Sequence, residues 1–166
     1  FSIVGNTRGT FSVIDFNIIL GDIMKSIITL LTVFLLSVPA FADDHYVRML
    51  NNGSSGMMVF EPAVLEVSVG DTVNFVATDM AHNSKSVLTP AGATPWNGAM
   101  NEEISITLDT PGVYIYECSP HAMMAMVGVI KVGDAKVDDA TKLFAGQYKS
   151  KFVMNNDRLD KYLSEM

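Results

Sequence analysis

The chain has 166 residues, of which 49% are hydrophobic and 17% are charged, and this balance predicts a folded protein of one domain rather than a disordered one. Acidic residues outnumber basic ones by 18 to 11, and the net charge of -7 at pH 7 argues against general binding to nucleic acid or to an anionic membrane. A single cysteine excludes an internal disulfide, a CxxC redox pair and a c-type haem attachment site.

The first predicted element is an export signal over residues 24–42. Met24 and Lys25 form a short positive start, the apolar run 27–38 follows, and Ala40-Phe41-Ala42 has the small-x-small pattern of a cleavage site. A membrane anchor is the alternative, but a span needs about 20 apolar residues and this run is shorter. We therefore expect cleavage after the last of these alanines and no membrane association of the mature chain.

Residues 1–23 lie upstream of this signal and show neither a clean hydrophobic period nor helix caps. We interpret them as a mis-set start that takes no part in the fold, with translation beginning at Met24. The segment 1–42 carries as many acidic as basic residues, so its removal leaves the net charge unchanged.

Residues 43–133 show short runs rich in β-branched and aromatic residues, separated by turn residues, which predicts an all-β, Greek-key type two-sheet β-sandwich. The expected strands are Tyr46–Leu50, Met57–Phe60, Val64–Val69, Thr72–Ala77, Ile104–Leu108, Gly112–Glu117 and Val127–Val132. Alternation of apolar and polar residues predicts one buried face in several of them. Gly70-Asp71 and the segment 109–112 are expected as turns between antiparallel neighbours, and 91–101 as a long surface loop.

Residues 134–166 change character and predict two short helices that extend the same domain. Asp138 or Asp139 is expected to cap the first helix, which runs to about Tyr148. The second is expected to open at Asn156 or Asp157. Its apolar face would carry Leu159, Tyr162 and Leu163.

The candidate site begins where the strand Gly112–Glu117 ends. Cys118, His121 and Met126 place a thiolate, an imidazole and a thioether within nine residues, and His82 is the best second imidazole because His45 lies in an expected frayed N-terminus. Two histidines and a cysteine in a plane, with a long axial methionine, suit copper as an electron carrier.

The plainer alternative is that the cysteine and the methionines only fill the core, which is their usual role. An exported, unpaired thiol is exposed to oxidation unless it is buried or bound to metal. The spacing from Cys118 through His121 to Met126 also has no packing explanation, so the metal site is favoured.

Several segments carry a family resemblance. They are Met49-Leu50-Asn51, residues 58–63, Gly70-Asp71-Thr72-Val73, His82-Asn83, residues 111–114, the loop 118–126 and Val132-Gly133-Asp134. Over nearly all of residues 46–166 the chain resembles the pseudoazurins, type 1 blue-copper proteins of the cupredoxin family. Plastocyanin-like proteins share the loop spacing but lack the helical tail.

The resemblance implies one type 1 copper ion per chain, bound by His82, Cys118, His121 and Met126. It also implies a monomeric, periplasmic electron shuttle that receives electrons from a cytochrome c-type donor and passes them to copper nitrite reductase or another periplasmic reductase. By the same resemblance, His121 is the ligand nearer the surface and His82 the interior one.

Two residues are expected to support the ligands from outside. In similar proteins, the backbone N–H at the position of Asn83 points at the thiolate. Pro120 has no N–H, so we expect it to keep a second hydrogen bond away from the sulfur and to stiffen the loop.

Two neighbouring methionines are alternatives to Met126 as axial ligand. Met124 would imitate the shorter loop of amicyanin-like proteins, and Met123 is the third candidate. Otherwise we expect Met58, Pro120, Ala122, Met123 and Met124 to form an apolar docking rim around His121.

Pseudoazurins usually surround that rim with lysines, but here Met80 and Glu117 occupy the positions before the ligands. We therefore expect docking through apolar contacts or to a less acidic partner, since electrostatic complementarity mainly sets the encounter rate and the choice of partner.

Two other function classes compete with the shuttle. Blue-copper centres occur in enzymes, but three histidines cannot supply a second, catalytic copper site, so we expect no enzymatic activity. A periplasmic copper-binding or delivery protein is the alternative, and a colourless, readily exchanged Cu(I) site would distinguish it.

Overall fold

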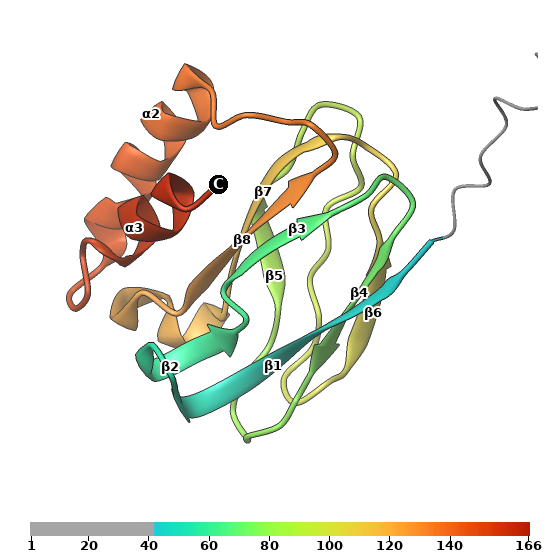
Figure 1. Ribbon diagram of the computed structural model, residues 1–166. Coiled ribbons are helices and arrows are strands. Elements are labelled where there is room, and N and C mark those ends of the chain that lie inside the picture. The colour runs from blue at the N-terminus through green and yellow to red at the C-terminus, as the bar shows by residue number, and fades with distance from the viewer. Residues whose placement is uncertain (1–41) are drawn as a thin grey trace, which may run out of the picture. The chain divides into compact units, whose positions relative to one another are not determined.

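The computed structural model describes residues 42–166 (Figure 1). The upstream segment 1–23 and nearly all of the expected signal peptide lie outside the described residues. The strands are β1 (Asp44–Gly53), β2 (Gly56–Glu61), β3 (Val64–Val67), β4 (Thr72–Val76), β5 (Lys85–Leu88), β6 (Ile104–Thr107), β7 (Gly112–Glu117) and β8 (Val127–Val132). The helices are α2 (Asp139–Tyr148), α3 (Arg158–Ser164) and the 3₁₀ helices η1 (Ser119–Met124) and η2 (Lys149–Lys151). Within this range no helix has the length and apolar character needed to cross a membrane.

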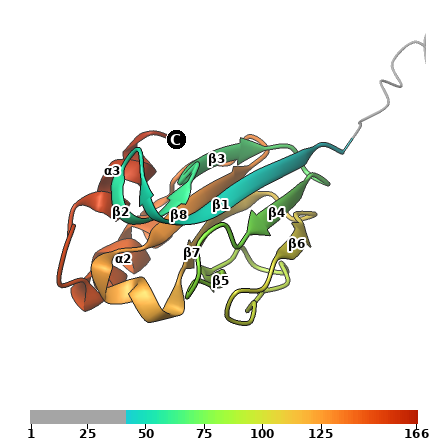
Figure 2. The ribbon, with the colours of Figure 1, turned by 90° about the horizontal axis from the view of Figure 1, so that it is seen from below.

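The strands form two four-stranded sheets, which confirms the predicted β-sandwich. One sheet has the order β2-β1-β4-β6 and the other the order β3-β8-β7-β5 (Figures 1 and 2). Two neighbouring pairs, β1 with β4 and β3 with β8, are parallel, and the remaining pairs are antiparallel. Aromatic rings fill the space between the sheets. The ring centroid of Tyr116 lies 4.7 Å from that of Phe60 and 5.0 Å from that of Phe75, and both pairs are edge to face.

The prediction that two turns each connect antiparallel neighbours was wrong. The turn at Gly70-Asp71 joins β3 to β4, and residues 109–112 join β6 to β7, but each pair of strands lies in two different sheets. Each turn therefore carries the chain across the sandwich. The turn residues were recognised correctly, with Gly70 at a φ of 95°. Local turn chemistry does not specify with which distant strand each segment pairs.

Two further expectations need correction in the region after β4. Strand β5 was missed, because its four residues show no alternating hydrophobic pattern. The expected surface loop 91–101 is not wholly at the surface, since Trp96 is buried in the main core. Its indole Nε1 donates to Ser84 Oγ at 2.9 Å, and its backbone N–H donates to Ser86 Oγ at 2.9 Å.

The helical tail packs on the outer face of the sheet that contains β7 and β8 (Figure 1). Asp138 caps α2 by accepting a hydrogen bond from Thr141 N at 2.7 Å. The helices bury a second cluster that includes Ile115 and Val129 of the sheet and Leu159 of α3. Strand β7 is therefore buried on both faces, not on one as its alternation suggested.

Candidate metal centre

The cysteine lies at the first position after β7, where the strand passes into η1. The alternation along β7 turns Tyr114, Tyr116 and Cys118 toward the inter-sheet core, and the cysteine is fully buried. Pro120 stands in the first turn of η1, where its missing N–H leaves no intrahelical hydrogen bond unmade. The end of strand β7 therefore holds the Cys118 thiol in place, and η1 brings the residues that follow back toward the sulfur.

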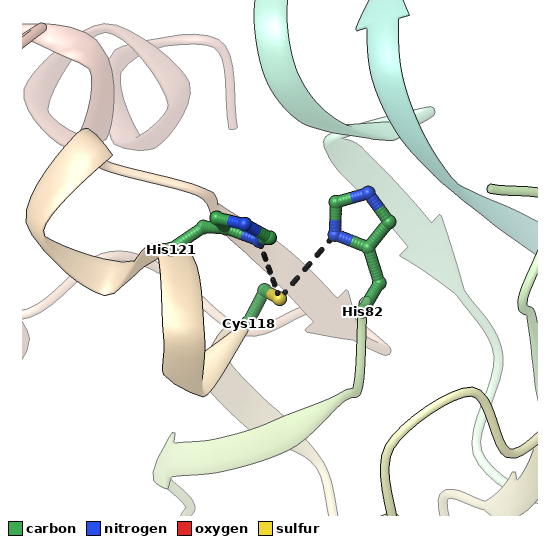
Figure 3. Close-up of side chains that lie close together, drawn as sticks. All are labelled: His82, Cys118 and His121. Carbon is green, nitrogen blue, oxygen red and sulfur yellow. Dashed lines mark hydrogen bonds between the residues drawn. The ribbon is translucent and has the colours of Figure 1, made fainter. Parts of the chain in front are cut away.

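Three metal-binding side chains meet at this point (Figure 3). The Nδ1 atom of His82 lies 3.5 Å from the Cys118 sulfur, and the Nδ1 atom of His121 lies 3.4 Å from it. The nitrogen and sulfur donor atoms all lie within 4.8 Å of one another. His82 reaches the cluster from the segment between β4 and β5, and His121 reaches it from η1.

These separations fit a single bound metal ion. Donor atoms about 2.0–2.3 Å from one ion, at angles near those of a triangle or tetrahedron, lie about 3.5 Å from each other. A thiolate with two imidazoles is also the donor set that suits copper. The geometry and the chemistry of this cluster therefore agree with the copper site expected from the sequence.

His82 is held from behind by Asn51 at the end of β1. The Oδ1 atom of Asn51 lies 3.0 Å from Nε2 of His82, which places the proton on Nε2 and leaves the Nδ1 lone pair facing the sulfur. The backbone N–H of Asn51 donates to Asp79 Oδ2 at 2.6 Å. This role of Asn51 was not predicted, because nothing in the sequence places the end of β1 beside His82.

Burial and two neighbouring side chains shift the pKa of His82. The ring is fully buried, and this burial lowers the pKa of His82, with further lowering by His121 and opposition from Asp79. The neutral imidazole, which is the metal-binding form, is thereby favoured.

Opposing effects act on the Cys118 thiol, and burial prevails, so that its pKa is raised. Burial raises the pKa of the Cys118 thiol, the backbone N–H groups of Asn83 and His121 lower it, and the charge of Glu117 raises it. A bound metal cation deprotonates a coordinating thiol outright, so it would overcome the effect of burial on Cys118. Pro120 removes one backbone donor, but it does not leave Asn83 as the only N–H that favours the thiolate.

Asn83 also joins the two ligand segments through its side chain. Its Oδ1 accepts a hydrogen bond from Ser119 N at 2.8 Å, and its Nδ2 donates to Gly98 O at 3.1 Å. The residue is buried, so these bonds are shielded from water. Asn83 therefore links the His82 segment directly to the start of η1.

Among the three candidate axial methionines, Met126 has the most interior position. It is fully buried in the same cluster as Cys118, whereas Met124 is half-buried and Met123 is 55% exposed. The backbone N–H of Met126 donates to His121 O at 3.2 Å, and its carbonyl accepts from Cys118 N at 3.0 Å. The backbone of Met126 is thus fastened to Cys118 and His121, the two candidate ligands of the same loop.

The residues expected in the docking rim differ in exposure. Pro120 and Met123 are exposed, and Met58, Ala122 and Met124 are half-buried. Met58 packs against the main core, while its neighbour Met57 is 56% exposed. Met80, which occupies a position where the sequence comparison with the family led us to expect a lysine, is 70% exposed.

Two other residues do not lie where the sequence suggested. Glu117 does not face the rim: it is buried and accepts a hydrogen bond from Tyr148 of α2. His45 does not belong to a frayed terminus, because it lies within β1 and its Nε2 is 2.8 Å from Asp71 Oδ2.

Comparison with known proteins agrees with this site. Residues 47–133 match the model of the copper binding proteins of the plastocyanin/azurin family. The chain is 44% identical over 110 residues to pseudoazurin from Paracoccus pantotrophus, covering 64% of this chain and 76% of the relative. The chain belongs to the pseudoazurin family. A pseudoazurin from Methylorubrum extorquens is 39% identical over 110 residues, covering 65% of this chain and 74% of the relative.

The solved structures give the same result for the fold. A pseudoazurin from Sinorhizobium superposes with a TM-score of 0.62 at 40% identity, covering 74% of this chain and 95% of the other. The predicted cupredoxin fold with a helical tail is therefore confirmed. As a pseudoazurin, the chain is an electron-transfer copper protein.

Proposed function

We propose that this pseudoazurin is a periplasmic electron shuttle whose single type 1 copper ion is bound by His82, Cys118, His121 and Met126. The observation that carries the proposal is the convergence of both histidine Nδ1 atoms on the buried cysteine sulfur, at 3.5 and 3.4 Å. When bound, copper supplies a centre that accepts and releases one electron.

The chain contributes a site that changes little when the charge of the centre changes. Asn51 orients the His82 ring, and Asn83 ties the segment before β5 to the start of η1. His82 comes from the segment between β4 and β5, and the other three proposed ligands come from the loop between β7 and β8. Because both segments are anchored in one core, the donor atoms keep their spacing. A small rearrangement favours fast electron transfer.

The route of the electron to a partner is assigned to His121. This ring is half-buried, whereas His82 and Cys118 are fully buried. Exposed Pro120 and Met123 lie on the same short helix as His121 and supply apolar contact area. A partner that docks on this rim approaches the copper ligand without displacing the core.

The proposed partners follow from the family and from the expected export signal. A cytochrome c-type donor and a reductase such as copper nitrite reductase would meet the monomeric protein in the periplasm after cleavage behind Ala42. The protein itself would carry out no catalysis, because its three histidines do not suffice for a second, catalytic copper site beside the proposed one.

The absorption spectrum of the copper-loaded, oxidised protein tests this proposal. A type 1 site gives an intense visible thiolate-to-copper band that disappears on reduction and returns on oxidation. His82→Ala should abolish the band, and the matched control His45→Ala should retain it because His45 pairs with Asp71, away from the cluster. A colourless Cu(I) protein that exchanges its metal readily would instead support the delivery function.

A further inference from the structure

The segment between α2 and α3 is fastened to the loop that carries the proposed copper ligands. The backbone N–H groups of Val153 and Met154 both donate to the carbonyl of Met123, at 2.8 and 3.3 Å. The side-chain Nδ2 of Asn155 donates to the carbonyl of Met124 at 3.2 Å. The tail thus binds two consecutive carbonyls at the end of η1, and only Ala125 separates them from the proposed axial ligand.

Arg158, at the start of α3, continues this series to the next carbonyl. Its Nη1 donates to Ala125 O and to Met58 O, both at 3.0 Å, and its Nη2 donates to Met57 O at 3.3 Å. The side chain belongs to a buried residue, and within residues 42–166 it forms no ion pair with a carboxylate. Backbone carbonyls therefore solvate the buried guanidinium, whose rigid fork lets it bridge β2 and the ligand loop.

The carbonyl of Ala125 belongs to the same peptide group as the N–H of Met126. Arg158 holds the carbonyl side of this peptide, and the carbonyl of His121 accepts from its N–H at 3.2 Å. The peptide plane is thus held from both sides. Because the Met126 Cα is attached to that plane, its orientation determines where the methionine side chain enters the core.

The backbone at this point needs such support. Ala125 has a φ of 57° and Met58 a φ of 48°, and both values lie in the left-handed region that is unfavourable for a non-glycine residue. Both residues offer their carbonyls to the same Arg158 nitrogen. One side chain therefore stabilises two unfavourable backbone conformations beside the ligand loop.

We propose that Arg158 is a positioning residue for the copper site, which sets the placement of the Met126 sulfur through the 125–126 peptide. The inference rests on the proposed ligand set. It gives the helical tail a function beyond packing, because a movement of α3 would alter the axial contact and thereby the reduction potential. The axial ligand is one of the features that tune the potential of such sites.

The test compares Arg158→Lys with Arg48→Lys in the copper-loaded protein. Lysine keeps the charge at position 158 but puts one nitrogen in place of the guanidinium fork, whose two nitrogens together reach Ala125, Met58 and Met57. We expect R158K to change the relative intensities of the visible thiolate-to-copper bands and to raise the reduction potential, because a looser Met126 donates less to the oxidised ion. Arg48 pairs with Glu61 on the surface, so R48K should leave both readouts at wild-type values.

A lower thermal stability of R158K with an unchanged spectrum and potential would overturn the proposal and assign Arg158 to the fold alone. If R158K does not fold, Asn155→Gly decides, since it removes the donor to Met124 O at a position with a φ of 54° that glycine accepts. N155G should shift the reduction potential in the same direction by a smaller amount. An unchanged potential in N155G would also overturn the proposal. A wild-type protein without a visible band would contradict the proposed function instead, so the two failures are distinguishable.

Discussion

The side-chain oxygen of Asn51 lies 3.0 Å from Nε2 of His82, and Cys118 lies 3.5 Å from Nδ1 of the same ring. The two contacts hold the imidazole from its two nitrogens, and removal of the outer partner frees the ring to rotate. We expect Asn51→Leu to weaken copper binding about 10–100-fold, the typical cost of losing such an outer hydrogen bond. Competition titration with a copper chelator measures this change.

Asn52→Leu is the matched control, because Asn52 is the exposed neighbour on β1, whereas the hydrogen-bond partner of His82 is Asn51. Its copper affinity should equal that of the wild type. An N51L protein with unchanged affinity would show that the surrounding core alone orients His82.

The second prediction concerns the axial ligand. Met126 is fully buried, whereas Met124 is half-buried and Met123 is mostly exposed. We therefore expect Met126→Ala alone to change the visible spectrum and the reduction potential, while Met124→Ala and Met123→Ala leave both near wild type. If Met124→Ala is the only substitution that changes them, the axial ligand is Met124.

The third prediction concerns the charge of the docking surface. Met80 is 70% exposed and Glu117 points inward, so neither position supplies the lysine that pseudoazurins usually carry there. We expect the rate of electron transfer to a copper nitrite reductase to vary only weakly with ionic strength. Stopped-flow measurement over a range of salt concentrations tests this expectation, and a steep fall with salt would contradict it.

Restoring a lysine makes the same test sharper. Met80→Lys should raise the rate with an acidic partner at low salt and make it salt-dependent. Leu143→Lys introduces the same charge at an exposed position of α2, within the helical tail, and should change the rate much less.

Much of the centre follows from residue order along the chain, because alternation along β7 and the tight η1 turn place Cys118, His121 and Met126 by local geometry. The position of His82 required the fold, since it comes from a separate segment. Asn51 and Arg158 were missed for the same reason: each acts on residues brought close only when distant strands and helices pack. Strand β5 was missed because it is short and its burial does not alternate.

The fourth prediction concerns acid stability. Asp71 is buried, and its carboxylate accepts hydrogen bonds from Asp43 N and Ser68 N at 3.0 and 2.8 Å and lies 2.8 Å from His45 Nε2. The Asp43 N–H, the His45 ring and the Ser68 N–H hold the pKa of Asp71 below its usual value, although burial opposes them.

Because this pKa is lower in the folded than in the unfolded chain, the ionised Asp71 stabilises the fold above about pH 4, and the contribution is lost as the pH falls through the folded value. Asp71→Asn should cost about 1–3 kcal/mol at pH 7 and flatten the acid limb of the stability profile. Urea unfolding between pH 2 and pH 7 measures both effects. Asp134→Asn, at an exposed position, is the control and should keep the wild-type slope.

The last prediction joins Asp71 to the proposed cleavage after Ala42. The N–H of Asp43 lies 3.0 Å from Asp71 Oδ1, so cleavage would replace a peptide N–H by an ammonium group beside a buried carboxylate. Charge-assisted hydrogen bonds are stronger than neutral ones. A chain that begins at Asp43 should therefore be more stable at pH 6 than the same chain acetylated at its N-terminus, by roughly 1 kcal/mol. The carboxylate would raise the pKa of the amino group, so the gain should be complete below about pH 8 and should be lost as the pH rises through the raised value. It should also vanish in Asp71→Asn, and equal stabilities of the two forms at pH 6 would contradict the prediction.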